Sequence, residues 1–175
     1  LLLAYVALRQ GDAVGVGTFA HDRPRFLPPR KSIATVSALM HGLFDLQPSL
    51  QIPDYLGAAT ALGRRLTKRA LIVFATTVRD EDGSALQEAG RMLRRKHAVV
   101  VANLREAALT RAKERPIADL EDALVYAAAT DYLERRRRTI ARLRRSGVQI
   151  IDVAPPGLAR HLVNQYWEVK RAGRA

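Results

Sequence analysis

The stretch LIVFATTVRDEDG, residues 71–83, joins a continuous apolar run to two threonines and an acidic loop. A run of this kind is typical of a strand that is buried on both faces of a parallel sheet. The carboxyl ends of such strands are where α/β proteins build their binding sites. The stretch therefore predicts an α/β fold, with Thr76 and Thr77 at the edge where a site is expected.

Strands and helices alternate along the rest of the chain. We expect strands at 13–19, 70–75, 98–104 and 147–153, and a short antiparallel strand at 25–27 that Pro28 and Pro29 stop. Helical spacing predicts helices at 33–46, 55–66, 84–96, 117–145 and 158–170, after an opening helix that Gly11 ends. This order predicts one domain, residues 1–175, with a mostly parallel, doubly wound sheet in three layers.

Two helix starts carry capping signals. Asp54 directly precedes the helix at 55–66 and is a typical N-cap residue. Ser84 and Gln87 form the S-x-x-Q pattern of a capping box. Within the first strand, Gly15 and Gly17 indicate that another stretch of backbone approaches closely.

The composition excludes several kinds of chemistry. The chain has no cysteine, which excludes disulfides, thiolate metal sites and a cysteine nucleophile, and which fits a reducing compartment. No phosphate-binding glycine loop, nucleophile elbow or acid–base pair is recognisable, so we expect no enzymatic activity. The opening apolar run stops at Arg9, far short of the roughly 20 residues of a membrane span.

The charge is strongly positive, with a net value of +12 and a pI of about 11.0. Such a charge favours anionic partners, although an arginine-rich genome produces the same bias. The run Arg135–Arg138 follows Asp131 and Glu134 at helical spacing, so it is either a solvated, ion-paired helix or an interaction surface. The low aromatic content, 6%, argues against nucleic acid. The candidates for contact with a partner are Arg135, Arg136, Arg137, Arg138, Arg142 and Trp167.

Six motifs, in order, span nearly the whole chain: GDAVGVGTF, RFLPPR, LQPSLQIPDYLGAATAL, RALIVFATTVRDEDG, RRKHAVVVANLRE and GVQIIDVAPPGLARHLVNQYWEVKRAG. Together they resemble the domain of unknown function 58 family, whose core is a von Willebrand factor A-like, Rossmann-like domain. The resemblance implies a metal-ion-dependent adhesion site, in which three loops hold Mg²⁺ through oxygen ligands. It also implies a non-enzymatic protein-interaction domain that partners a MoxR-type AAA+ ATPase in protein assembly or maturation. The resemblance places this domain in the cytoplasm, often in membrane-anchored proteins.

The sequence departs from the family pattern at the metal ligands. The D-x-S-x-S of the first loop would lie upstream of Leu1, and the Thr-Asp of the third loop corresponds to Thr76-Thr77, where a hydroxyl replaces the carboxylate. Asp54 reads equally well as a helix cap, and Asp80 as part of a solvated turn. We therefore expect a degenerate site, marked by Asp54, Thr76, Thr77 and Asp80, that binds no Mg²⁺.

The resemblance to this family also implies that the first, central strand of the sheet is missing. Its absence would leave unpaired backbone groups on two strands. A longer native chain, a rearrangement of the remaining strands, or a second copy in a homo-oligomer would satisfy them. A nucleic-acid-binding module that uses the arginine-rich surface is the alternative function.

Overall fold

The structure is a computed structural model that describes residues 1–20, 23–47, 49 and 51–173. Its elements follow the chain in the order α1 (Leu2–Arg9), β1 (Val14–Gly17), β2 (Phe26–Arg30), α2 (Thr35–Leu43), α3 (Tyr55–Arg65), β3 (Leu71–Thr76), α4 (Gly83–Arg94), β4 (Ala98–Leu104), α5 (Ala107–Glu114), α6 (Leu120–Arg145), β5 (Gln149–Val153) and α7 (Pro155–Arg171). No helix in these ranges is long and apolar enough to cross a membrane.

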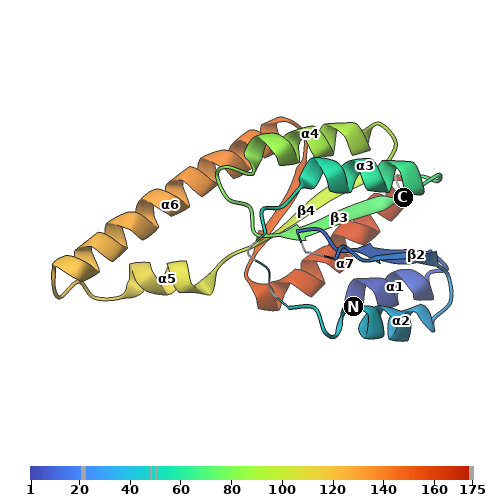
Figure 1. The fold of residues 1–175 in the computed structure, drawn as a ribbon, viewed down its shortest axis with the longest axis horizontal. Coiled ribbons are helices and arrows are strands. Elements are labelled where there is room, and N and C mark those ends of the chain that lie inside the picture. Colours follow the sequence, from blue (N-terminus) through green and yellow to red (C-terminus); the bar gives the residue numbers. More distant parts are fainter. Residues whose placement is uncertain (21–22, 48, 50, 174–175) are drawn as a thin grey trace.

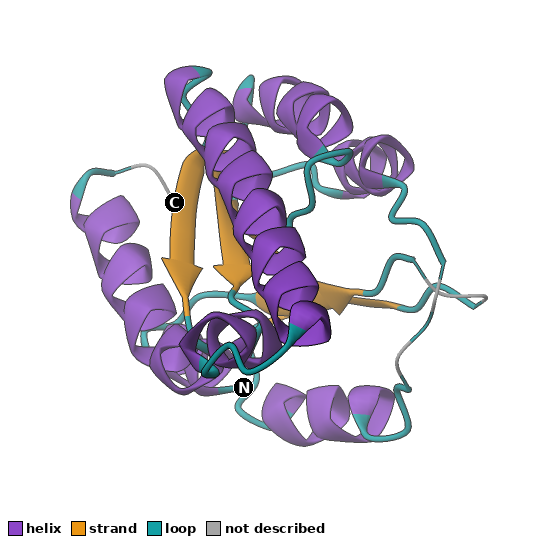
Figure 2. Cartoon of the chain, turned by 90° about the vertical axis from the view of Figure 1, so that its left-hand side faces the viewer, coloured by secondary structure: helices purple, strands orange, loops and turns teal. Residues whose placement is uncertain are grey.

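A parallel sheet of three strands, in the order β3-β4-β5, forms the centre of the molecule. Helices α3 and α4 and the C-terminal half of α6 cover one face, and α7 and α1 lie on the other side (Figure 1). Figure 2 shows the same layers from the side. The predicted α/β class with a parallel sheet is confirmed, and the arrangement is compatible with a Rossmann-like fold.

The described strands do not form one continuous sheet. β1 and β2 make a separate antiparallel pair, and β3 is an edge strand of the parallel sheet. β4 is buried on both faces, as predicted, whereas β3 is buried only through Ile72 and Phe74. Ala75 on the opposite face is exposed because α7 packs on β4 and β5. The prediction that this strand is buried on both faces is therefore wrong.

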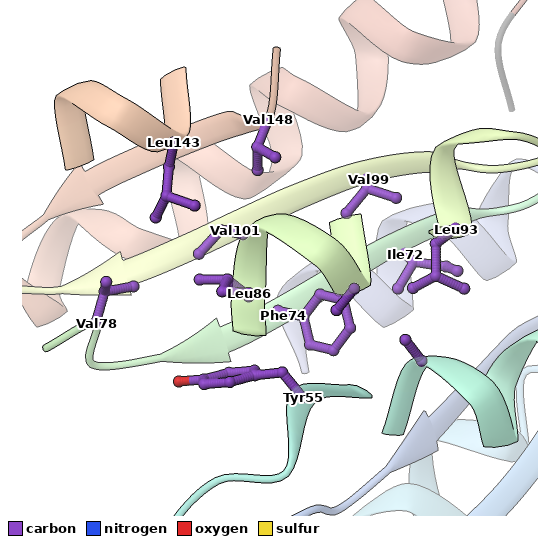
Figure 3. Packing of buried hydrophobic residues seen from close by; sticks show 12 residues of the cluster. Tyr55, Ile72, Phe74, Val78, Leu86, Leu93, Val99, Val101, Leu143 and Val148 are labelled. Atoms are coloured by element: carbon purple, nitrogen blue, oxygen red, sulfur yellow. The ribbon is translucent and has the colours of Figure 1, made fainter. Parts of the chain in front are cut away.

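The core lies between the sheet and helices α3, α4 and α6. Phe74 and Val101 are register neighbours on the face toward these helices, and Tyr55, Leu86 and Leu143 close over them (Figure 3). Phe19 adds an edge-to-face contact with Phe74, with the ring centroids 5.9 Å apart. Burial of each large side chain contributes about 1.5–3 kcal/mol, so this cluster is the main source of stability.

Asp54 caps α3 as predicted, because its Oδ1 accepts a hydrogen bond of 2.8 Å from the amide of Gly57. The prediction that Ser84 starts a capping box is wrong, because α4 begins at Gly83 and its N-cap residue is Asp82. Gly15 does mark a close approach, since a Cβ there would lie 2.6 Å from the Leu27 carbonyl oxygen.

Other boundaries differ from the predictions. β2 continues through Pro28 and Pro29 instead of stopping there, which an edge strand tolerates because it has one unpaired side. α2 is shorter than the predicted helix at 33–46, and the apolar residues Ile33, Met40 and Phe44 of that range are exposed. α5 was not predicted.

A polar cluster joins the two ends of the chain. The Tyr166 hydroxyl and Lys170 Nζ on α7 both donate to Asp12 Oδ2, over 2.5 and 2.8 Å. Asp12 directly follows Gly11, whose φ of +78° turns the chain after α1. Burial acts to raise the pKa of Asp12, but the hydrogen bonds from Lys170 and Tyr166 outweigh it, and the pKa falls below 3.8. The ionised carboxylate is therefore the form that the fold favours.

This cluster predicts a specific acid sensitivity. Because the pKa of Asp12 is lower in the folded state, its contribution to stability is present above pH 3.8 and is lost as the pH falls through the folded value. Asp12→Asn should lower the free energy of unfolding at pH 7 by about 1 kcal/mol or less, since the pair is partly solvated. In urea titrations, this difference from the native chain should disappear in acid.

The control is Glu88→Gln, at an exposed position of α4. It removes the same charge and should leave the unfolding free energy unchanged at both pH values. An Asp12→Asn variant as stable as Glu88→Gln at pH 7 would contradict the role of the cluster.

Candidate functional site

Three polar residues form a row across the carboxyl end of the parallel sheet. Thr76 of β3 is paired in register with Asn103 of β4, and Asn103 with Asp152 of β5. Side chains alternate along a strand, so this row lies on the same face as the apolar row of Phe74 and Val101. It marks the point where the core gives way to the edge of the sheet.

Asn103 is the centre of the row and is fully buried. Its Oδ1 accepts a hydrogen bond of 2.7 Å from the amide of Val78, in the loop after β3. Its Nδ2 donates to Asp152 Oδ1 over 2.9 Å. One side chain therefore fixes the loop after β3 against the end of β5.

Asp152 also binds two arginines. Arg136 Nη2, on α6, donates to Asp152 Oδ1 over 2.7 Å, and Arg136 is only 7% exposed. Arg105 Nη2 donates to the Asp152 carbonyl oxygen over 2.9 Å, and its Nε lies 3.7 Å from Oδ2. The carboxylate is neutralised within the fold and holds α6 against the sheet.

The threonines of the predicted site are half-buried at this edge. Thr76 Oγ1 lies 2.9 Å from the Tyr55 hydroxyl. Burial raises the pKa of Tyr55, and the hydrogen bond to Thr76 acts in the opposite direction. The Asp54 carboxylate, one residue before Tyr55, is occupied with capping α3. The start of α3 therefore lies beside Thr76, but the residue that contacts Thr76 is Tyr55 and not Asp54.

The acidic loop, residues 80–82, is balanced by arginine. Arg79 Nε lies 3.3 Å from Glu81 Oε1 and 3.5 Å from Asp82 Oδ2. Asp80 Oδ2 lies 3.9 Å from Arg135 Nε, which brings α6 over the loop. Between the loop and α6 is a hollow of about 240 Å³, bordered by Asp80, Glu81, Ser84, Thr139 and Arg142.

These donors do not fit a magnesium site. Mg²⁺ requires several free, hard oxygen ligands in a near-octahedral arrangement. At this edge the Thr76 hydroxyl binds tyrosine, the Asp54 carboxylate binds a helix amide, and Asp152 binds arginine. Across the described residues, no group of three or more His, Asp or Glu side chains is arranged to hold a metal ion.

The arginine run is divided between the core and the surface. Arg136 is turned inward, so its assignment to an interaction surface is corrected. Arg137 and Arg138 are exposed and lie 3.7 and 3.2 Å from Glu134, and Arg135 lies 2.8 Å from Asp131. Four consecutive residues point in different directions because an α-helix has 3.6 residues per turn.

The remaining contact candidates are only partly available. Arg142 is exposed and donates to Thr139 Oγ1 over 2.8 Å. Trp167 is half-buried, with its ring against Tyr166 at 5.4 Å between centroids. Part of the Trp167 ring is therefore covered by the fold and is not free to contact a partner.

Sequence reasoning missed Asn103 and Asp152. A signal existed, because each interrupts an apolar strand, AVVVANL and QIIDV, one residue before its end. Polar residues in that position on adjacent parallel strands meet at one edge of the sheet. The partner Arg136 carried no such signal, since its neighbours in the sequence are identical arginines.

The hydrogen bonds of Asn103 predict a large effect on stability. Asn103→Leu should lower the free energy of unfolding by about 2–3 kcal/mol, because the buried amide of Val78 and the Asp152 carboxylate each lose a partner. Thr76→Val, which removes one hydrogen bond nearer the surface, should cost about 1 kcal/mol or less. Chemical denaturation of both variants measures the difference, and equal costs would contradict the central role of Asn103.

A second prediction concerns metal. Millimolar Mg²⁺ or Mn²⁺ should leave the melting temperature of the protein unchanged, because an ion that binds only the folded state would raise it. Differential scanning fluorimetry and native mass spectrometry measure this directly. A rise in melting temperature that Asp54→Ala or Asp80→Asn removes would show that the edge does hold a divalent cation.

Comparison with known proteins gives a family but no characterised relative. No curated protein and no solved structure matches the chain. The family model described as "Protein of unknown function DUF58" matches residues 1–148. Since this match covers most of the 175 residues, the chain belongs to the DUF58 family.

Proposed function

We propose that this chain is a non-enzymatic protein-interaction domain of von Willebrand factor A-like architecture, and that it binds its partner through a helical arm instead of a metal ion. The arm consists of α5, the loop after it and the first turns of α6, residues 107–128. One observation carries the proposal: this arm extends beyond the body of the molecule and exposes large apolar side chains.

The arm has few contacts with the body. All residues of α5 are exposed or half-buried, and the first buried residue of α6 is Ala129. In Figure 1, α5 and the beginning of α6 extend to the left, past the layers that cover the sheet. The two helices pack on each other, so the arm is an antiparallel helical pair.

The arm exposes large apolar side chains. Leu120 and Leu124 lie four residues apart on α6 and are 75% and 62% exposed, and Ile117 is exposed in the loop before α6. Val125 and Tyr126 add further exposed apolar surface. A helix that is merely solvated carries polar residues on its outer face, whereas an exposed apolar stripe marks an interaction site.

The tip of the arm is well ordered by local hydrogen bonds. Asp119 caps α6 by accepting from the amide of Asp122 over 2.8 Å. Asp122 in turn lies 3.3 Å from Arg115 Nε and accepts from the amide of Ala118. A surface that is already fixed loses little conformational entropy on binding, which favours association.

The partner that we propose is a MoxR-type AAA+ ATPase, in a cytoplasmic complex that assembles or matures other proteins. Support for this partner comes from the resemblance stated above and from the family to which the chain belongs. Support for the mode of contact comes from the arm. Nucleic acid is the less favoured partner because the arginines of the α6 run are paired with carboxylates.

The test replaces two leucines of the arm. Leu120→Asp with Leu124→Asp should weaken binding to the purified ATPase about tenfold or more, since loss of a hot-spot residue costs about 2 kcal/mol or more. Both side chains are largely exposed, so the melting temperature should stay the same. Binding is measured by interferometry, with ATP, with ADP and without nucleotide.

The matched control is Ala159→Asp, on an exposed position of α7 away from the arm. It adds a negative charge to the surface and should bind as the native chain does. Binding that survives the double substitution would reject the arm as the contact. Binding of DNA or RNA that falls steeply with salt, and that is lost in Arg137→Gln with Arg138→Gln, would favour the nucleic-acid alternative.

A further inference from the structure

A second hollow lies on the other side of the core, at the amino end of the parallel sheet. It is a groove of about 320 Å³ between the C-terminal turns of α3 and α4. Its main lining residues are Ala59, Gly63, Arg64, Met92, Lys96 and His97. His97 directly precedes β4, so the groove lies far along the strands from the row of Thr76, Asn103 and Asp152.

Gly63 lines this groove and leaves free space above it. It lies inside α3, where glycine is less favourable than alanine. A Cβ at Gly63 would meet no described atom within 4 Å, whereas one at Gly42 or Gly57 would collide with a neighbouring side chain. Packing within the described chain therefore does not require glycine at this position.

His97 supplies a polar group at the floor of the groove. The residue is 5% exposed, and among the described residues no atom forms a hydrogen bond with its buried Nδ1. Burial and the charge of Lys96 lower the pKa of His97, so the ring is neutral at pH 7. A proton on Nδ1 would be a buried N–H without a partner, which is costly. The neutral ring therefore carries its proton on Nε2, which makes His97 a hydrogen-bond donor at that atom.

Two cations flank the groove. Arg64 and Lys96 are exposed, and neither is paired with a carboxylate anywhere in the part of the chain that the structure describes. Lys96 Nζ donates to the Leu66 carbonyl oxygen over 3.2 Å, which holds it beside the end of α3. Ala59, Met92 and Leu93 form an apolar wall.

We propose that this groove binds a small aliphatic carboxylate, with the carboxylate between Arg64 and Lys96 and the alkyl chain along Ala59, Met92 and Gly63. Ligand sites are apolar hollows with a few polar groups and volumes of about 300–1,000 Å³. The groove is at the lower end of that range and fits a single short chain rather than a peptide helix. This site is independent of the proposed partner and of the arm.

The experiment titrates the full chain with octanoate and follows the amide resonances by NMR. Octanoate should bind saturably and shift the resonances of α3 and α4 around Gly63 and Lys96. Octan-1-ol has the same chain without the charge, and octylamine has the opposite charge. Both should bind severalfold more weakly, because neither presents an anion to Arg64 and Lys96 and exposed charge pairs contribute modestly to affinity.

Two pairs of variants make the result specific. Gly63→Leu fills the groove and should abolish octanoate binding, whereas Ala61→Leu, on the exposed side of the same helix, should bind as the native chain does. Lys96→Gln should weaken binding more than Arg95→Gln, which removes an equal charge from a residue that does not line the groove. Melting curves confirm that each variant is folded.

Several outcomes would overturn the proposal. One is octanoate binding that is unchanged in Gly63→Leu. Another is an equal loss in Lys96→Gln and Arg95→Gln, which would mean nonspecific attraction to a cationic protein. Equal affinity for octanoate and octylamine, or resonance shifts confined to other elements, would reject the carboxylate site as well.

Discussion

The ion pair between Arg136 and Asp152 is the interaction on which the carboxyl end of the fold depends. A charge as deeply buried as Arg136 needs a partner, because an unpaired buried charge costs several kilocalories per mole. Asp152 provides it and also binds Asn103, which reaches the loop after β3. Through one carboxylate, α6, β4, β5 and that loop are held in a single arrangement.

This constraint also positions the surface that we propose to be functional. α6 is a helix of 26 residues, and only its C-terminal half is anchored, by Arg136, Ile140 and Leu143. The N-terminal half continues in the same direction and leaves the body together with α5. A continuous helix transmits its orientation along its length, so the buried ion pair fixes where Leu120 and Leu124 are presented. In this arrangement the row at the sheet edge supports α6 through the hydrogen bonds of Asn103 and Asp152.

The sequence predicted where helices and strands lie more reliably than it predicted which side chains are buried. Apolar runs located β3, β4 and β5, and Asp54 and Gly11 marked helix ends, because these signals are local. The sequence did not predict that β3 is covered on only one face, since an apolar run does not reveal which helices pack over it. It also did not distinguish Arg136 from its neighbours, because the direction of a helical side chain depends on how the whole helix is docked.

The polar groups at the edge of the sheet satisfy one another within the fold. A carboxylate that faces an open edge must be solvated, paired or bound to a metal. Here Asp152 is paired with arginine, and Thr76 and Tyr55 satisfy each other with neutral hydroxyls. Asp152, Thr76 and Tyr55 therefore each have a partner within the chain. The exposed apolar side chains of the arm, Leu120 and Leu124, have no such partners among the buried residues that the structure describes, which is why we place the proposed contact there and not at this edge.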